Sequence, residues 1–202
     1  MFLILGPALN LVAGFFWEDD RQGLVSGTLL ALSIGAWLVG LAGIYERLRP
    51  AAPRYVAVAL PLTVFACVGG LAFAIQSVQE VVFDVSHAVA VERLQEHPFA
   101  AYPLYWILGP AFPIALFLLG LAVWRLRAAP AWVGLLIALG ALAFPLSRIT
   151  RDANIAHVAD VLLLVPFVYL GLRSLRRSRP PSGASSGPSS GAESRPAPIP
   201  AA

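Results

Sequence analysis

Six apolar segments, separated by short polar or proline-containing connections, dominate the hydrophobic pattern of this chain of 202 residues. They cover residues 2–17, 24–45, 55–76, 103–124, 131–147 and 154–172. About 20 apolar residues cross a bilayer core as a helix, and a helix satisfies its own backbone hydrogen bonds in lipid. The pattern therefore predicts an all-α bundle of six membrane-spanning helices within residues 1–175.

The segment between the third and fourth spans, residues 77–97, has a different pattern. Its valines recur at helical spacing, whereas Gln76, Glu80, Asp84 and His87 share another face. This predicts one outer amphipathic helix between the third and fourth spans, which continues from the third span and ends before Pro98, and which either lies at the membrane interface or covers the bundle.

Small residues recur at every fourth position in two of the spans. They are Gly23, Gly27, Ala31 and Gly35 in the second span, and Ala66, Gly70 and Ala74 in the third. Such ridges let a neighbouring helix approach closely. Residues 176–202 are instead rich in Arg and then in Ser, Gly, Pro and Ala, which predicts a disordered tail.

The composition agrees with a membrane protein: 58% of the residues are hydrophobic, 12% are charged, and the mean hydropathy is +0.77. Soluble domains carry about 25% charged residues. All basic residues are arginine, which excludes lysine Schiff-base chemistry. The single cysteine, Cys67, excludes an intrachain disulfide and clusters of cysteine ligands.

The arginines are distributed unequally between the two sides of the bundle. Ten lie after the second and fourth spans and in the tail: Arg47, Arg49, Arg54, Arg125, Arg127, Arg173, Arg176, Arg177, Arg179 and Arg195. Four lie on the other side: Arg21, Arg93, Arg148 and Arg151. Because cytoplasmic loops carry the excess of arginine, both termini are predicted to be cytoplasmic in a protein of the cell membrane.

Ionisable side chains gather on the predicted outer side. Nine of the eleven acids and all three histidines are there: Glu18, Asp19, Asp20, Glu80, Asp84, Glu92, Glu96, Asp152, Asp160, His87, His97 and His157. Acids contribute little to orientation, so the topology signal does not account for this cluster.

A polar stripe formed by Asn154, His157 and Asp160 opens the sixth span, and Asn10 lies at a similar depth in the first. A buried aspartate costs about 2.5–3.5 kcal/mol at the centre of a span, and such residues usually face the bundle interior. Two interpretations are open. The stripe is a proton- or metal-binding site, or it is a clasp in which Asp160 bonds to Asn10, His157 or an arginine of the outer turn.

Imidazole and carboxylate side chains are the candidate metal ligands: His157, Asp160, His87, Asp84, Glu80 and His97. Their spacing matches no zinc motif such as HExxH. Haem is the weaker alternative, because only His157 lies within a span and bundle cytochromes bury paired histidines. The cofactor, if there is one, is not identified.

No nucleophile and partnered base stand out in the sequence, which favours a non-enzymatic accessory or interaction protein. Its expected partners are the lipid bilayer and another membrane protein or a second copy of the chain. The topology accounts for the basic residues, so nucleic acid is excluded. The alternative function is a small-solute or ion transporter, or a metal-binding protein, that uses the outer His/Asp cluster.

Overall fold

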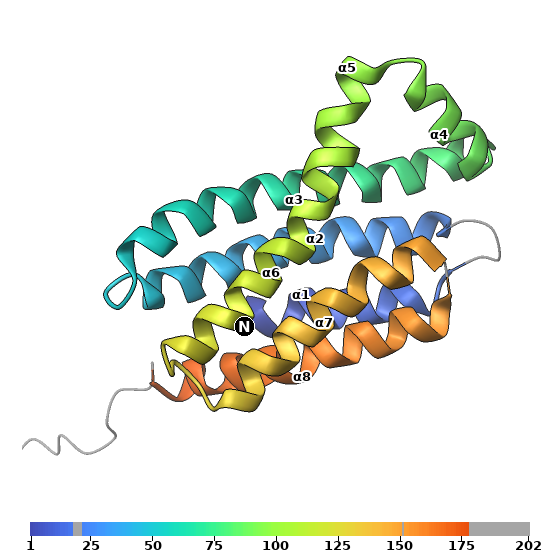
Figure 1. Cartoon of the computed structure of the whole chain (residues 1–202). Helices are drawn as coiled ribbons and strands as arrows, with labels where there is room; N and C mark the ends of the chain where they lie inside the picture. Colours follow the sequence, from blue (N-terminus) through green and yellow to red (C-terminus); the bar gives the residue numbers. More distant parts are fainter. Residues whose placement is uncertain (18–21, 151, 178–202) are drawn as a thin grey trace, which may run out of the picture.

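The computed structural model of the chain describes residues 1–17, 22–150 and 152–177, apart from the side chains of residues 148, 149 and 177. All regular elements in these ranges are helices (Figure 1). They are α1 (Phe2–Gly14), α2 (Gly23–Leu48), α3 (Pro53–Val82), α4 (His87–Gln95), α5 (Pro98–Ala101), the π-helix η1 (Tyr102–Ile107), α6 (Leu108–Arg125), α7 (Ala131–Thr150) and α8 (Ala153–Arg177). The polar turn at residues 18–21, Arg151 and residues 178–202 of the predicted tail lie outside the described residues.

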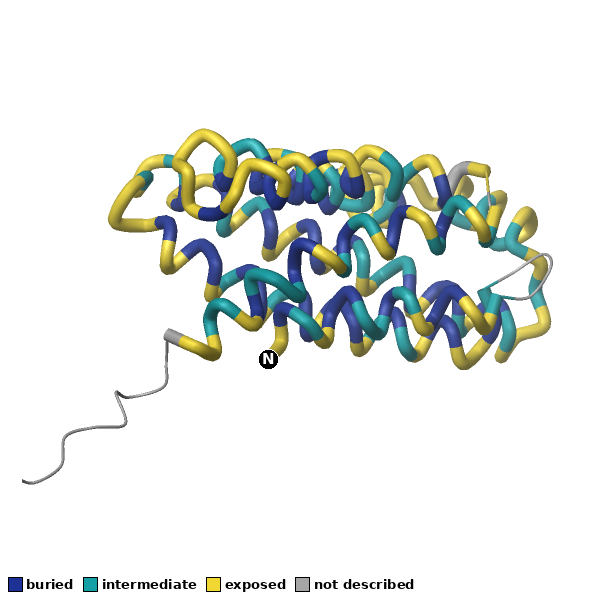
Figure 2. The backbone as a smooth tube through the Cα atoms, turned by 90° about the horizontal axis from the view of Figure 1, so that it is seen from below, coloured by how far each residue is buried: buried dark blue, intermediate teal, exposed yellow. Residues whose placement is uncertain are grey.

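Six helices, α1, α2, α3, α6, α7 and α8, pack side by side as a closed ring (Figure 1). Going round the ring, α1 contacts α2, α2 contacts α3, α3 contacts α6, α6 contacts α7, α7 contacts α8, and α8 returns to α1. Buried and exposed positions alternate along each helix, as expected where one face meets its neighbours (Figure 2).

Four helical segments are long and apolar enough to span a membrane: Gly23–Leu48, Pro53–Val82, Pro98–Arg125 and Ala153–Arg176. The described part of the chain is therefore all-helical, with four candidate membrane-spanning helices. The first and fifth predicted spans form shorter apolar helices, Phe2–Gly14 and Ala131–Ser147, so the predicted six spans are not confirmed. About 20 residues are needed to cross a bilayer core without tilting or thinning, and α1 has 13.

Aromatic side chains fill the centre of the ring. The Trp37 ring of α2 meets Phe112 of α6 edge-on at 5.8 Å and Phe167 of α8 at 4.6 Å. Phe112 also packs at 5.7 Å against Phe144 of α7. Each such pair contributes about 0.5–1.5 kcal/mol beyond the burial of its area, so these contacts tie opposite walls of the ring together.

Glycines mark the closest helix crossings, but the predicted ridge of α2 packs along only part of its length. Gly27 does pack on α3, where an added Cβ would lie 2.8 Å from the Val78 side chain. Gly35, in contrast, is exposed and has no atom within 4 Å of its Cβ position. The prediction of one continuous ridge was wrong because positions four apart shift by about 40° round a helix. Twelve residues after Gly23, the ridge faces away from the neighbour.

The predicted amphipathic helix over residues 77–97 is two helices rather than one. α3 ends at Val82, Asp84 adopts a left-handed conformation with φ 51°, and the Ser86 side chain caps α4 by accepting from the Val89 backbone. Aspartate tolerates this conformation and serine favours the N-cap, which explains the break. The chain then returns through α5 and η1 into α6, forming a lobe beyond α3 (Figure 1).

Candidate functional site

Two polar clusters lie at the end of the bundle where α1 and α3 finish and α8 begins (Figure 1). The first joins α1 to α8. Nδ2 of Asn10 donates a hydrogen bond of 2.5 Å to Oδ1 of Asp160, and both side chains are buried, with 5% and 2% of their surface exposed. Asn10 is one of the three partners that the clasp interpretation names for Asp160. A bond between two helices at a buried position has the geometry of that clasp.

Gly14 leaves space for this cluster because it has no side chain. One turn after Asn10, it presents only backbone to α8, and an added Cβ would lie 3.4 Å from Nε2 of His157 and 3.8 Å from Oδ2 of Asp160. His157 and Asp160 therefore converge on the same small surface of α1. Neither Gly14 nor this convergence was predicted, although the spacing of four residues from Asn10 places Gly14 on the same helix face.

The His157 ring is held from two sides. Nδ1 lies 2.5 Å from the backbone carbonyl of Ala153 and must donate its proton, because a carbonyl only accepts. The ring packs at 4.3 Å against Phe15. Nε2 is buried and makes no hydrogen bond to any described residue. Asn154 does not join the cluster: it is exposed, and its backbone N–H bonds to Asp152, which caps α8.

The second cluster is built on Glu80, near the end of α3, and only 5% of Glu80 is exposed. Its Oε1 accepts a hydrogen bond of 2.9 Å from Nε2 of Gln76 and lies 2.7 Å from Nδ1 of His87. Gln76 and Glu80 thus point inward, while Val82 is exposed. A buried carboxylate requires such partners, whereas valine is compatible with lipid.

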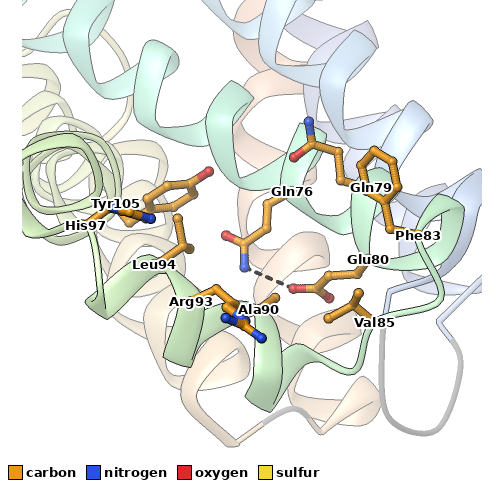
Figure 3. A pocket seen from close by; sticks show the side chains of 10 residues that line it. All are labelled: Gln76, Gln79, Glu80, Phe83, Val85, Ala90, Arg93, Leu94, His97 and Tyr105. Atoms are coloured by element: carbon orange, nitrogen blue, oxygen red, sulfur yellow. Dashed lines mark hydrogen bonds between the residues drawn. The ribbon is translucent and has the colours of Figure 1, made fainter.

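Glu80 lies at a cavity of about 310 Å³ between α3, α4 and η1 (Figure 3). The cavity is lined by Gln76, Gln79, Glu80, Phe83, Val85, Ala90, Arg93, Leu94, His97 and Tyr105. Figure 3 shows Gln76 and Glu80 on one wall, with Arg93 of α4 across from them and Tyr105 beside His97. Leu94 and Tyr105 were not predicted to belong to a site, and no sequence motif marks them.

Four of the six candidate metal ligands form two separate pairs, and the six do not come together as one set. Glu80 bonds to His87, and His157 and Asp160 meet at Gly14. Asp84 is exposed in the turn after α3, and His97 lines the cavity. Within the described ranges, no three His, Cys, Asp or Glu side chains are grouped so that they could hold a metal ion.

No protein-family model, no curated protein and no solved structure matches this chain. The chemistry of the two clusters and the shape of the cavity are therefore the basis for assigning a function. The Asn10–Asp160 pair is enclosed between two helices, whereas the cavity beside Glu80 has the volume to admit another molecule.

Proposed function

We propose that this chain is a six-span membrane protein, with both termini in the cytoplasm, that binds a small amphipathic ligand without transforming it. The observation that carries the proposal is the cavity of about 310 Å³ beside the buried carboxylate of Glu80. Apolar walls with a few polar groups are typical of ligand sites. None of the ten lining side chains is a serine, threonine or cysteine, which favours binding over nucleophilic catalysis.

The packing of α1 and α7 supports the six spans. α1 lies between α2 and α8, and α7 lies between α6 and α8, so each shares the depth of two longer apolar helices. An apolar helix that packs between two membrane-spanning helices lies in the hydrocarbon region with them. A short span is accommodated by local thinning of the bilayer at a modest cost.

The charges at the two ends of the bundle support the orientation. Seven described arginines lie where α2, α6 and α8 end and α3 begins: Arg47, Arg49, Arg54, Arg125, Arg127, Arg173 and Arg176. By the positive-inside rule this end is cytoplasmic. The cavity and the Asn10–Asp160 pair then lie at the outer end.

Native mass spectrometry of the full-length protein, purified in a mild detergent, tests the binding proposal. We expect the protein to carry a small-molecule adduct, and Glu80→Gln to reduce its occupancy. A hydrogen bond to a charged group is worth about 1.5–3 kcal/mol, which corresponds to about tenfold or more in affinity. Glu92→Gln is the matched control, since Glu92 is exposed on α4 and does not line the cavity.

Two results would contradict the proposal. One is that no adduct depends on Glu80. The other is that the bound molecule is released with an altered mass during incubation with the wild-type protein but not with the Glu80→Gln variant, which would show catalysis.

A further inference from the structure

The polar groups of the cavity are divided by charge. The carboxylate of Glu80 comes from α3, whereas the side chains of Arg93 and His97 come from α4 and the turn after it. Figure 3 shows Arg93 below Gln76 and Glu80, and His97 to the left beside Tyr105. A ligand that fills this space meets a hydrogen-bond acceptor on α3 and donors on α4 and in the turn after it.

Glu80 retains capacity for a further donor. Both of the hydrogen bonds that Glu80 accepts, from Gln76 and from His87, engage Oε1, and Oε2 accepts none from a described residue. A carboxylate has about four lone-pair positions on its two oxygens. A ligand group with several N–H donors, such as a primary ammonium, matches this acceptor in charge and in hydrogen bonding.

Arg93 can bind an anion at little cost. Its only described partner is Glu96, at 3.5 Å, and both side chains are largely exposed to solvent. Exposed pairs of this kind contribute little to stability, so a bound phosphate could displace Glu96. Arginine and phosphate form paired, charge-assisted hydrogen bonds, which makes guanidinium a preferred phosphate ligand.

The cavity lies at the depth of lipid headgroups. Tyr102 and Trp106, on either side of the lining residue Tyr105, are exposed, as such residues are at the membrane–water boundary. Phe83 is both a lining residue and 69% exposed, and Phe99 of the same lobe is 98% exposed. Apolar surface therefore continues from the cavity to the lipid side.

We infer that the ligand is a phospholipid whose headgroup carries a primary ammonium and a phosphate. The ammonium binds Glu80, the phosphate binds Arg93 and His97, and the glycerol and acyl chains follow Phe83 out of the cavity. This inference rests on the proposed function, because it names the class of ligand for the same site. A headgroup with a net negative charge would be repelled by Glu80, and a quaternary ammonium has no N–H to donate to it.

The experiment titrates delipidated full-length protein in detergent with one lipid at a time, followed by native mass spectrometry. The probes are phosphatidylethanolamine, phosphatidylcholine and phosphatidylglycerol, with soluble phosphoethanolamine as a competitor. We expect phosphatidylethanolamine to bind about tenfold tighter than either other lipid, which is the loss expected for one charge-assisted hydrogen bond. Phosphoethanolamine alone should compete weakly, because it lacks the apolar contacts.

Single substitutions test which side chains bind the lipid headgroup. Glu80→Gln should abolish the preference for the primary ammonium, and Arg93→Gln should weaken all three phospholipids. Arg93 is exposed, so its replacement tests the site without risk to the fold. Glu92→Gln is the control and should bind as the wild-type protein does.

Each contrary outcome has a separate meaning. Equal binding of the three lipids that still depends on Glu80 overturns the headgroup assignment and leaves the proposed function standing. Competition by phosphoethanolamine as strong as that of the lipid overturns the lipid as the source of the headgroup. If no lipid and no co-purified molecule depends on Glu80, both the inference and the proposed function are wrong.

Discussion

The close crossing between α6 and α7, where a glycine of one helix faces a glycine of the other, gives a sharp test of the packing. A Cβ added to Gly120 would lie 2.7 Å from the carbonyl oxygen of Gly134 and 2.8 Å from the backbone N of Ala138. A Cβ added to Gly134 would lie 2.6 Å from the carbonyl oxygen of Gly120. These neighbours are backbone atoms, so a change of side-chain rotamer cannot relieve the clash. The two helices must move apart.

The size of the effect follows from a comparison of Gly120→Ala with Gly35→Ala. Both substitutions replace glycine by alanine within a helix, which favours the helix by about 1 kcal/mol in each case. Gly35 has nothing within 4 Å of its Cβ position, so the stability change of Gly35→Ala reflects helix propensity alone. The difference between the two variants is then the cost of overpacking, typically about 1–3 kcal/mol.

The free energy of unfolding in mixed micelles, followed by far-UV circular dichroism, measures this difference. We expect Gly120→Ala to be less stable than Gly35→Ala by about 1–3 kcal/mol, and Gly134→Ala to behave like Gly120→Ala. Equal stability of the Gly120 and Gly35 variants would refute a close backbone crossing of α6 and α7 at this point.

Two further predictions concern the proposed orientation and the Asn10–Asp160 pair. In a Cys67→Ala background, an impermeant thiol reagent applied to intact cells should label Glu92→Cys and not Arg125→Cys; the reverse pattern would invert the orientation. In the same unfolding assay, Asp160→Asn should be at least as stable as the wild-type protein, because the amide still accepts from Asn10 and carries no charge. Asp160→Leu leaves Nδ2 of Asn10 without this acceptor and should lower the free energy of unfolding by about 1–3 kcal/mol. If Asp160→Asn were less stable than Asp160→Leu, the charge of Asp160 itself would be required.

The helical architecture could be predicted because the hydrophobic pattern constrains it strongly. A long apolar segment in lipid must satisfy its backbone within the segment, which only a helix allows for a single segment. The segment predicted at residues 24–45 is α2, Gly23–Leu48, and that predicted at 154–172 lies within α8, Ala153–Arg177. The additional length comes from polar or basic ends, such as Arg47, which an apolar pattern does not include.

The neighbours of each helix could not be predicted, because many faces of an apolar helix are equally compatible with lipid and with protein. The small residues of α2 indicated a ridge, yet the tightest crossings pair Gly120 with Gly134 and bring Gly69 against the backbone of Leu108. Gly69 and Gly120 have no small residue four positions before or after them, and Gly134 has only Ala138. Their role depends on which helix the fold places opposite them.

The two candidate sites were predictable to different degrees. Asn10 and Asp160 could be matched because both are polar residues at a similar depth in their spans. Gln76, Glu80, Asp84 and His87 were predicted to share one helix face, but the burial of each could not be predicted: Glu80 is buried, whereas Asp84 is exposed. On a soluble amphipathic helix the polar face meets water. In a membrane bundle, in contrast, valine can face lipid and a buried carboxylate must find its partners within the protein.

The positions of the buried acids favour binding at the end of the bundle over passage through it. Among the described residues the buried acids are Glu80 and Asp160, and both lie near the end where α3 finishes and α8 begins. Midway along the ring, Trp37 and the phenylalanines packed on it occupy the space between the walls. A transport path needs polar groups near the bilayer midplane, where the helices of transporters are broken. Here the middle of the ring is packed with aromatic rings, which supports the proposed binding at the cavity beside Glu80 over transport.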